Sequence, residues 1–166
     1  MGGFTIVELL IVIVVIAILA AITIIAYNGI QNRSYNVSVE ADLSNVAKKL
    51  EIYKIQNDAY PINITELDAA DFKASLGSYY VISGRANFYY CTDNTNPTTY
   101  AIGVISKSKQ GYYMINGKVT ASAADSTGSL WAANTCSQIG LTAGDSNVTS
   151  PSGLNGSTGI WADWVQ

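Results

Sequence analysis

Residues 3–26 read GFTIVELLIVIVVIAILAAITIIA, an apolar run with a single charged side chain, the carboxylate of Glu8. The next charge along the chain is Arg33. A run of about 18 or more apolar residues is long enough to form a membrane-spanning helix. At about 1.5 Å per residue, a helix from Phe4 to Ala26 would span roughly 34 Å, more than the roughly 30 Å of a hydrocarbon core. The sequence therefore predicts a membrane helix with one acid near its start.

Glu8 is the exception in this run, because a carboxylate inside a bilayer costs about 2.5–3.5 kcal/mol on insertion scales and is usually paired. Two ordinary explanations compete with a functional role. A signal peptide has a basic start and an apolar core of about 7–15 residues, whereas this run is longer and residues 1–3 contain no Lys or Arg. A plain membrane anchor, with Glu8 as an incidental interfacial acid, stays open from the residues alone.

The N-terminal string resembles the processing signature of the type IV pilins and type II secretion pseudopilins: Gly3-Phe4-Thr5-Ile6-Val7-Glu8-Leu9-Leu10, followed by the apolar run. The resemblance implies cleavage by a membrane peptidase after Gly3 and methylation of the new terminal amine on Phe4. It also implies that Glu8 guides subunits into a filament, and that the partners include an inner-membrane assembly platform and its ATPase.

The sequence departs from this family at two places. The expected leader, residues 1–3, has no basic residue, and Ile25 stands where many members have a proline. Proline kinks or breaks a helix. Without it, Gly29 is the weak point left near Ile25 where the helix could melt in a filament.

Charge pairing gives Glu8 a physical role once the cleavage that the resemblance implies has occurred. Before cleavage, we expect its carboxylate to have no partner at its depth. After cleavage, the Phe4 amine is a cation that can meet Glu8 of a neighbouring copy. At about 4 Å this pair attracts by about 4 kcal/mol at an effective dielectric near 20, more than the insertion cost of the acid. Glu8 is therefore expected to set the register between copies, as buried polar groups do in coiled coils.

Composition narrows the other functions. The 166 residues suit one domain, the net charge is −3, and the nine basic side chains are scattered, whereas nucleic-acid binding usually shows a basic patch. The chain has no histidine, which removes His-based triads, zinc–histidine sites and the commonest general base. The acids Asp125, Asp145 and Asp163 show no spaced calcium-ligand pattern. We expect no enzyme activity, cofactor, metal or specific nucleic-acid partner.

After Arg33 the pattern becomes amphipathic. Apolar residues recur at alternating spacings of four and three, which indicates one buried helix face: Val39, Leu43, Val46, Leu50 and Tyr53, joined by Ala47. Charged residues are predicted on the other side: Glu40, Asp42, Lys48, Lys49, Glu51 and Lys54. The helix should end at Asn57–Pro61, because the residue before a proline avoids helical angles. One helix is predicted from about Thr5 to about Gln56, with a stripe in its second half that a domain covers.

The remaining pattern predicts a short helix and then a sheet. Thr65–Asp68 offers a cap followed by acids. Strand signals follow at Ser78–Ser83, Asn87–Thr92, Thr98–Lys107 and Gly111–Thr120, the last with a turn at Asn116-Gly117. Short links favour antiparallel neighbours. The fold class is therefore α+β and pilin-like: a long N-terminal helix, with a membrane-spanning first half, packed on a small antiparallel sheet of three or four strands.

Tyrosines occur as three doublets, Tyr79-Tyr80, Tyr89-Tyr90 and Tyr112-Tyr113. Adjacent strand residues face opposite sides, so one tyrosine of each doublet is expected in the core. The others could form an exposed row for adhesion, subunit packing or stacking on DNA bases. Ordinary aromatic pairing between strands explains them as well and is favoured.

Cys91 and Cys136 are the two cysteines. In a chain outside the cytoplasm they most simply form one disulfide, and members of the resembled family often pin a C-terminal loop by such a bond. Two buried free thiols are the alternative. Trp161 and Trp164 are expected to dock on the domain or on a neighbouring copy.

The sequence thus divides into a leader, a polymerisation helix half and a globular domain: residues 1–3, 4–32 and 33–166. Within the domain it predicts the amphipathic helix half, the sheet and a loop-rich region: residues 33–56, 78–120 and 121–166. The resemblance implies a membrane protein that assembles into a cell-surface type IV pilus for adhesion, motility or DNA uptake. One alternative is the major pseudopilin of a type II secretion system, in a periplasmic filament. Another is a membrane-anchored binding protein that never polymerises.

Overall fold

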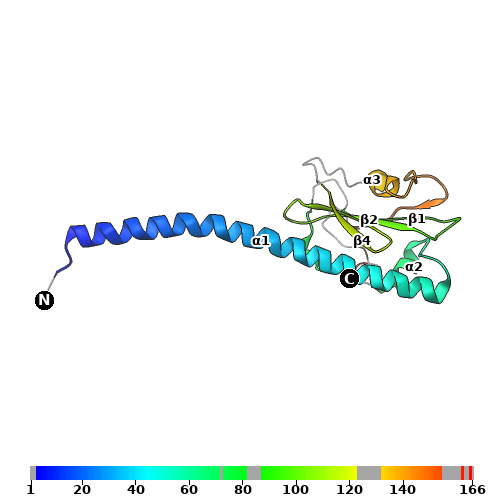
Figure 1. Ribbon diagram of the computed structural model, residues 1–166, viewed down its shortest axis with the longest axis horizontal. Coiled ribbons are helices and arrows are strands. Elements are labelled where there is room, and N and C mark those ends of the chain that lie inside the picture. The colour runs from blue at the N-terminus through cyan, green and yellow to red at the C-terminus, as the bar shows by residue number, and fades with distance from the viewer. Residues whose placement is uncertain are drawn as a thin grey trace. The chain divides into compact units, whose positions relative to one another are not determined.

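The computed structural model describes residues 3–71, 73–81, 87–122 and 132–154, together with Ala162 and Val165. Contacts divide the chain into two units, Met1–Ser34 and Tyr35–Gln166, which are described separately. Helix α1, Ile6–Asn57, begins in the first unit and ends in the second (Figure 1). Its bounds confirm the single long helix that the sequence predicts.

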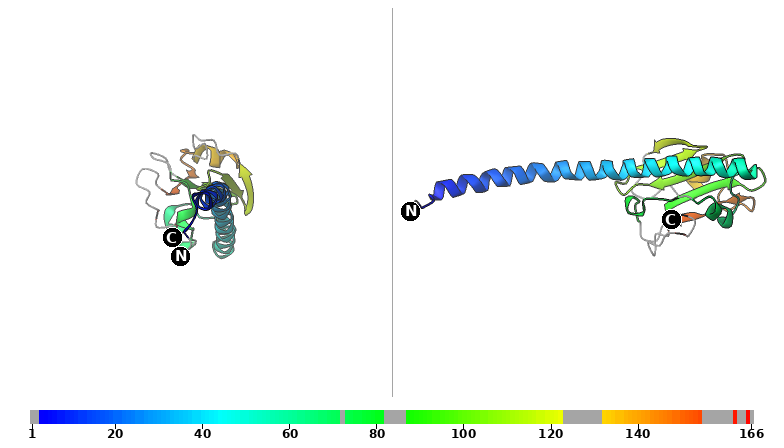
Figure 2. Two further views of the ribbon diagram at one scale, coloured as in Figure 1. Left: turned by 90° about the vertical axis from the view of Figure 1, so that its left-hand side faces the viewer. Right: turned by 90° about the horizontal axis from the view of Figure 1, so that it is seen from below.

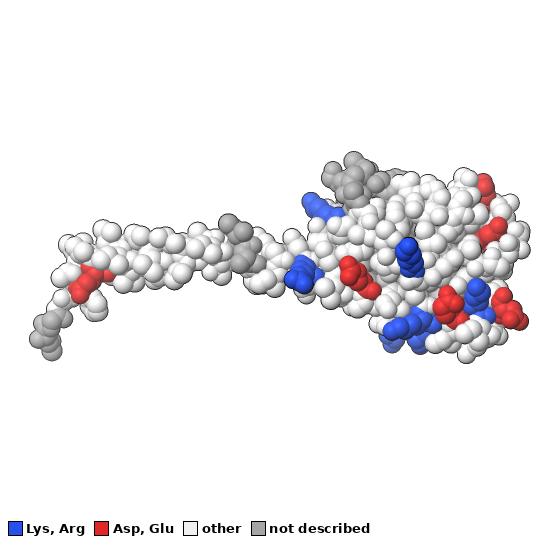
Figure 3. All heavy atoms as spheres, viewed as in Figure 1, with Lys and Arg blue, Asp and Glu red and all other residues white. Residues whose placement is uncertain are grey.

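The first unit consists mainly of the apolar half of α1. This half is long and apolar enough to cross a membrane, and none of its most hydrophobic stretch is buried. Thr23, which interrupts the apolar run, donates its hydroxyl to the carbonyl of Leu19 at 2.7 Å, so its polar group is satisfied inside the helix. On the face that Figure 3 shows, this half carries no charge apart from an acidic patch near its N-terminal end.

The second unit contains an antiparallel sheet. Its first four strands are neighbours in chain order: β1 Asn87–Asp93, β2 Tyr100–Ile105, β3 Gly111–Ile115 and β4 Lys118–Ser122. Two short strands, β5 Val148–Thr149 and β6 Ser152–Leu154, both pair antiparallel with β1. The register places Tyr90 opposite Ile102, and Ile102 opposite Met114. The predicted strands at Asn87–Thr92, Thr98–Lys107 and Gly111–Thr120 are confirmed, including the turn at Asn116-Gly117.

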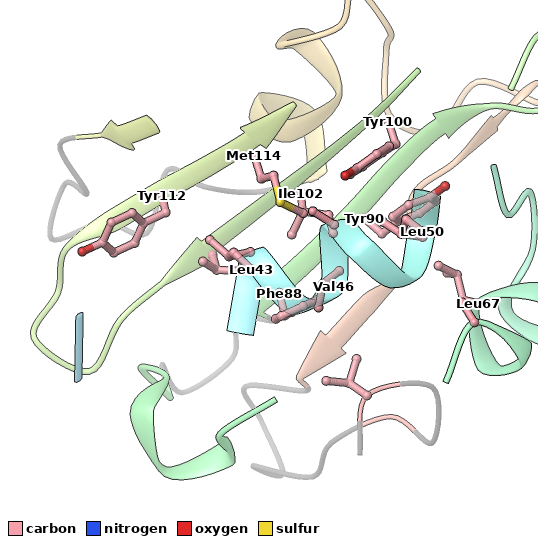
Figure 4. Packing of buried hydrophobic residues seen from close by; sticks show 14 of the residues in the cluster. Leu43, Val46, Leu50, Leu67, Phe88, Tyr90, Tyr100, Ile102, Tyr112 and Met114 are labelled. Atoms are coloured by element: carbon pink, nitrogen blue, oxygen red, sulfur yellow. The ribbon is translucent and has the colours of Figure 1, made fainter. Parts of the chain in front are cut away.

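The core lies between the second half of α1 and one face of this sheet (Figures 2 and 4). The helix contributes most of the side chains that the periodicity predicts: Val39, Leu43, Val46 and Leu50, all without solvent exposure, and Ala47. Tyr53, predicted on the same face, is only partly buried at the edge of the core. The sheet contributes Phe88, Tyr90, Tyr100, Ile102, Val104, Tyr112 and Met114. Full burial of a large apolar side chain is worth about 1.5–3 kcal/mol, so this stripe of α1 is a main source of the domain's stability.

Helix α2, Ile64–Ala69, begins one residue before the segment predicted for it. Its cap is Asn63, whose Oδ1 accepts a hydrogen bond from the Glu66 amide at 2.9 Å. Glu66 reaches back and accepts from the Ile62 amide at 3.0 Å. The prediction of Thr65 as the cap is therefore wrong. The reason is the reciprocal arrangement between the cap residue and the acid three positions later, which satisfies two backbone donors at once.

The predicted strand at Ser78–Ser83 is wrong in its described part, since residues 82–83 lie outside the described ranges. A 3-10 turn, η1 Leu76–Ser78, precedes Tyr79, which makes only an isolated bridge to Ser106. Asp42 explains the difference, because its carboxylate holds this segment on α1. It accepts from the Ser75 amide at 2.6 Å, the Ser75 hydroxyl at 3.0 Å and the Tyr79 hydroxyl at 3.0 Å.

The tyrosine doublets place one ring each in the core, as predicted. Tyr79, Tyr90 and Tyr112 are buried, whereas Tyr80, Tyr89 and Tyr113 are half-buried. The rings of Tyr90 on β1 and Tyr100 on β2 stack with centroids 6.2 Å apart. Tyr100 also meets Tyr60 edge-on at 4.7 Å. The stack of Tyr90 on Tyr100 is an aromatic pair between strands, as expected for that doublet.

The other face of the sheet carries helix α3, Ala132–Ser137, which contacts β1 and β2 (Figure 1). The predicted disulfide between Cys91 and Cys136 is present and joins β1 to α3, with Cα atoms 5.3 Å apart. A side chain at Gly103 would collide with Thr135, so the close approach of α3 requires glycine there. Nothing in the sequence pattern predicted α3, β5 or β6. The expected docking of Trp161 and Trp164 lies outside the described residues.

Candidate functional site

The candidate site is the segment at the head of α1, where the sequence predicts processing and assembly. Gly3, Phe4 and Thr5 precede the helix and have no regular secondary structure. Phe4 is 90 % exposed, and a Cβ added at Gly3 would meet no atom within 4 Å. The backbone on both sides of the Gly3–Phe4 bond is therefore open to a second molecule.

Thr5 and Glu8 form a reciprocal cap at the start of α1. Glu8 Oε2 accepts from the Thr5 amide at 2.8 Å and from the Thr5 hydroxyl at 2.7 Å. The Thr5 hydroxyl oxygen accepts in turn from the Glu8 amide at 3.3 Å. This is a capping box, in which a Thr and a Glu three residues apart satisfy two of the helix's free donors. The negative charge also lies at the positive end of the helix dipole.

The expectation that Glu8 lacks a partner before cleavage is therefore wrong. Thr5 supplies two donors from the same chain, and hydrogen bonds to a charged group are stronger than those between neutral groups. They offset part of the cost of placing a carboxylate in a membrane. The spacing Thr5-x-x-Glu8 is the sequence signal that would have revealed this partner.

The cap leaves part of the Glu8 carboxylate available. Both bonds from Thr5 go to Oε2, and among the described residues no hydrogen bond reaches Oε1. The Thr5 amide belongs to the Phe4–Thr5 peptide bond, so cleavage between Gly3 and Phe4 would not remove it. Glu8 can therefore keep its cap and still accept a hydrogen bond from a cation on another copy.

The remaining predicted site residues lie in the other unit. Cys91 and Cys136 are both buried and bonded, so they have a structural rather than a chemical role. Within the described ranges, no group of three or more acids and cysteines could hold a metal ion. Of the three acids considered for calcium, Asp125 and Asp163 lie outside those ranges, and Asp145 is exposed.

The chain combines a helix long enough to span a membrane, a capped acid at the start of that helix and an α+β domain at its end. This combination is typical of filament subunits that are held in a membrane by their N-terminal helix. Comparison with curated proteins identifies the class. The chain is 32% identical over 126 residues to the "Type IV wide pilus major component PilA4" of Thermus thermophilus, covering 75% of this chain and 95% of that protein. The chain belongs to the type IV pilin family.

Two further relatives are named as type II secretion system core protein G. The protein of Pseudomonas aeruginosa is 31% identical over 68 residues, 41% of this chain and 48% of its own length. That of Klebsiella michiganensis is 31% identical over 74 residues, 45% of this chain and 52% of its own length. The chain thus matches about half of these two relatives. No family model matches it.

Proposed function

We propose that this protein is a structural subunit that polymerises through its apolar N-terminal helix into a type IV pilus. The observation that carries the proposal is the exposed apolar half of α1, headed by the capped carboxylate of Glu8. Such a surface is stable only in a membrane or against other apolar helices. The chain matches a major pilus component over 95% of that protein's length. This match supports packing against the apolar helices of other copies in the assembled state.

Processing at the head prepares the chain for assembly. A membrane peptidase cleaves the exposed Gly3–Phe4 bond, and the new amine of Phe4 is methylated without losing its positive charge. The open backbone around Gly3 and the 90 % exposure of Phe4 support this step. Before assembly the chain sits in the membrane with its globular domain outside the cytoplasm. An inner-membrane platform and its ATPase then move it into the filament.

Glu8 sets the register of assembly. The amine of an incoming copy binds the free Oε1 of Glu8 on a copy already in place. A pair in the wrong register leaves the amine without a counter-charge, and leaves Glu8 with only the neutral donors of Thr5, in an apolar environment, which is unfavourable. Because the Thr5 cap holds the carboxylate in one position, the acceptor is preorganised for the amine.

The decisive experiment compares Glu8→Ala and Glu8→Gln with the wild type in the native host. Both variants should insert into the membrane at least as well, because they remove a costly charge. Filaments sheared from the cells should be lost in both, since neither side chain attracts the amine as an anion does. Asp145→Ala removes an exposed carboxylate outside the apolar half of α1, so it is the control and should retain filaments. Abundant filaments from Glu8→Gln would refute the role of the Glu8 charge.

Mass spectrometry of wild-type filaments tests the processing step. The mature chain should begin at Phe4, and its terminal amine should carry a methyl group.

A second candidate is the major pseudopilin of a type II secretion system, supported by the matches to the two core G proteins. Deleting the gene separates the two. Loss of surface filaments with normal export of secreted proteins supports the pilus. Loss of export supports the pseudopilin.

A further inference from the structure

A groove runs along the flank of α1 that faces away from the sheet, in the globular unit. Its walls are Asn45, Lys48, Lys49 and Ile52 of α1, and Asp71 and Lys73 after α2. The groove has a volume of about 440 Å³. A smaller hollow of about 170 Å³ shares Lys49, Ile52 and Asp71, and continues along α1 to Gln56. The two form one continuous surface beside α2.

This groove is positively charged although the chain as a whole is acidic. Three of the nine basic side chains of the sequence line it, and Asp71 is its single acid. The Asp71 Oδ2 atom lies 3.3 Å from the Lys49 Nζ atom, and the side chains are 73% and 45% exposed, respectively. Ion pairs this exposed contribute little to the free energy of folding. Among the described residues, Lys48 and Lys73 have no ion pair.

The groove is also partly apolar, because Ile52 is 51% exposed. A fitting occupant therefore presents an apolar side chain next to an acid. Helix α2 carries that pair on its outer face. Ile64 is 59% exposed and Asp68 is exposed without an ion pair among the described residues. They are four residues apart, so they lie one above the other on one side of the helix.

We propose that the groove receives the outer face of α2 from a second copy of this chain. Ile64 packs on Ile52, and Asp68 lies between Lys48 and Lys73. The proposal rests on the proposed function, because it names one contact between subunits of the filament. The two surfaces differ, so every copy offers one of each. A heterologous contact does not close a dimer, and it propagates into an open helical filament when its rotation does not close into a ring.

Cross-linking within filaments tests the contact directly. Cells co-express two chains, one with Ile52→Cys and one with Ile64→Cys, so that a bond between the new thiols is necessarily intermolecular. The native cysteines are buried and bonded to each other. Mild oxidation of the mixed filaments should give a dimer on a non-reducing gel, and a reductant should remove it. Filaments with only one of the two variants should give none.

Val37→Cys paired with Ile64→Cys is the matched control. Val37 is 57% exposed on the same helix, but it lies 15 residues from Ile52, or about 22 Å at about 1.5 Å per residue. This pair should give no dimer. Filaments that form normally but give no Ile52–Ile64 dimer, or as much from the control, would overturn the contact while leaving the proposed function standing. Absence of filaments from the wild type would instead refute the proposed function.

Charge exchange provides a second readout. Lys48→Glu should reduce the yield of sheared filaments several-fold, and Asp68→Lys should do the same. Combining the two should restore most of the yield, because the pair is re-formed with opposite sign. Lys118→Glu, an exposed lysine on β4 outside the groove, makes the same change in net charge and should leave the yield unchanged. Failure of the combined variant to recover would contradict the pairing.

Discussion

At the scale of single residues, the buried side chain of Asn87 replaces backbone pairing between β1 and β2 at the start of β1. Asn87 uses its full hydrogen-bonding capacity there. Its Oδ1 accepts from the amides of Phe88 at 2.7 Å and Ile105 at 2.9 Å. Its Nδ2 donates to the carbonyls of Tyr80 at 2.9 Å and Ile105 at 2.8 Å. These bonds hold Phe88 at a φ of 58°, a conformation that is uncommon for a bulky residue.

Asn87→Asp should destabilise the domain by about 2–5 kcal/mol, because a carboxylate has no N–H groups, so the carbonyls of Tyr80 and Ile105 each lose a hydrogen bond and a charge is buried. The free energy of unfolding in urea measures the effect. Asn96→Asp changes the same group at an exposed position and should cost less than about 0.5 kcal/mol. Equal effects at the two positions would show that the Asn87 network contributes nothing specific.

Thr5 gives a second prediction at this scale. Thr5→Val removes the hydroxyl that bonds Glu8 but keeps the shape, and loss of such a cap costs about 1 kcal/mol. Filament yield should fall, although less than in Glu8→Ala, because the charge of Glu8 remains. Thr5→Ser keeps the hydroxyl and should behave as the wild type. The idea fails if Thr5→Val and Thr5→Ser give the same yield.

At the scale of elements, periodicity decided what the sequence could predict. Between Val39 and Leu50, apolar residues recur at helical spacing over several turns, which predicts α1. Longer apolar and aromatic runs, such as Tyr100–Ile105, predict the strands β1 to β4. Strands β5 and β6 have two and three residues, too few to show alternation. Asp42 was placed on the exposed side of α1, yet it is only 8% exposed. Its partners Ser75 and Tyr79 are distant in sequence, so no local pattern revealed them.

The same distinction holds for the head of α1. The positions of Gly3, Phe4 and Glu8 follow from the string itself, and the helix begins at Ile6 as expected. The partner of Glu8 did not follow from an argument about charge alone. Charge alone predicts an unpaired carboxylate in an apolar run, whereas the hydroxyl and amide of Thr5 lie within one turn of it.

The disulfide carries a prediction about α3. Replacing Cys91 and Cys136 by alanine together opens a link across 45 residues, and the chain-entropy argument gives a loss of about 3–4 kcal/mol. Amide exchange should rise most over Ala132–Ser137 and least over the buried part of α1, because α3 loses its covalent tie to β1. Uniform acceleration across the domain would show that α3 is not held separately by the bond.

At the scale of the whole molecule, the two units differ in how much apolar surface they expose. The first unit exposes its apolar helix, whereas the second buries the apolar stripe of α1 in its core. A chain beginning at Arg33 keeps the covered stripe of α1 and the sheet but lacks the exposed apolar half. We expect it to be soluble, folded and monomeric, as judged by circular dichroism and sedimentation. Aggregation of this shortened chain with the Cys91–Cys136 bond intact would contradict the assignment of the buried stripe.

Alkaline pH should destabilise the globular unit through its buried tyrosines. Burial, and then the nearby charge of Glu40, raises the pKa of Tyr112 to about 12, and burial raises the pKa values of Tyr79 and Tyr90 well above their usual range. An unfolded tyrosine ionises near pH 10. The stability from these groups is therefore complete below about pH 10 and is lost as the pH rises through the folded pKa values.

Urea unfolding at several pH values, with tyrosinate absorbance as a second signal, measures this loss. The buried rings should ionise only as the domain unfolds. Tyr112→Phe removes one such group and should flatten part of the decline above about pH 10. A decline of unchanged slope in this variant would show that Tyr112 does not take part.

Strand β1 meets β2 along one edge, while its other edge is covered by β5 and β6. Synthesis runs from the N-terminus, so β1 is made well before residues 148–154. Until those residues arrive, the second edge of β1 keeps free N–H and C=O groups, which invite strands from other chains. A nascent chain, or one that ends before Val148, therefore has an unpaired edge on β1, to which a strand of a neighbouring chain can add. Completion of the C-terminal segment is what makes each copy self-contained.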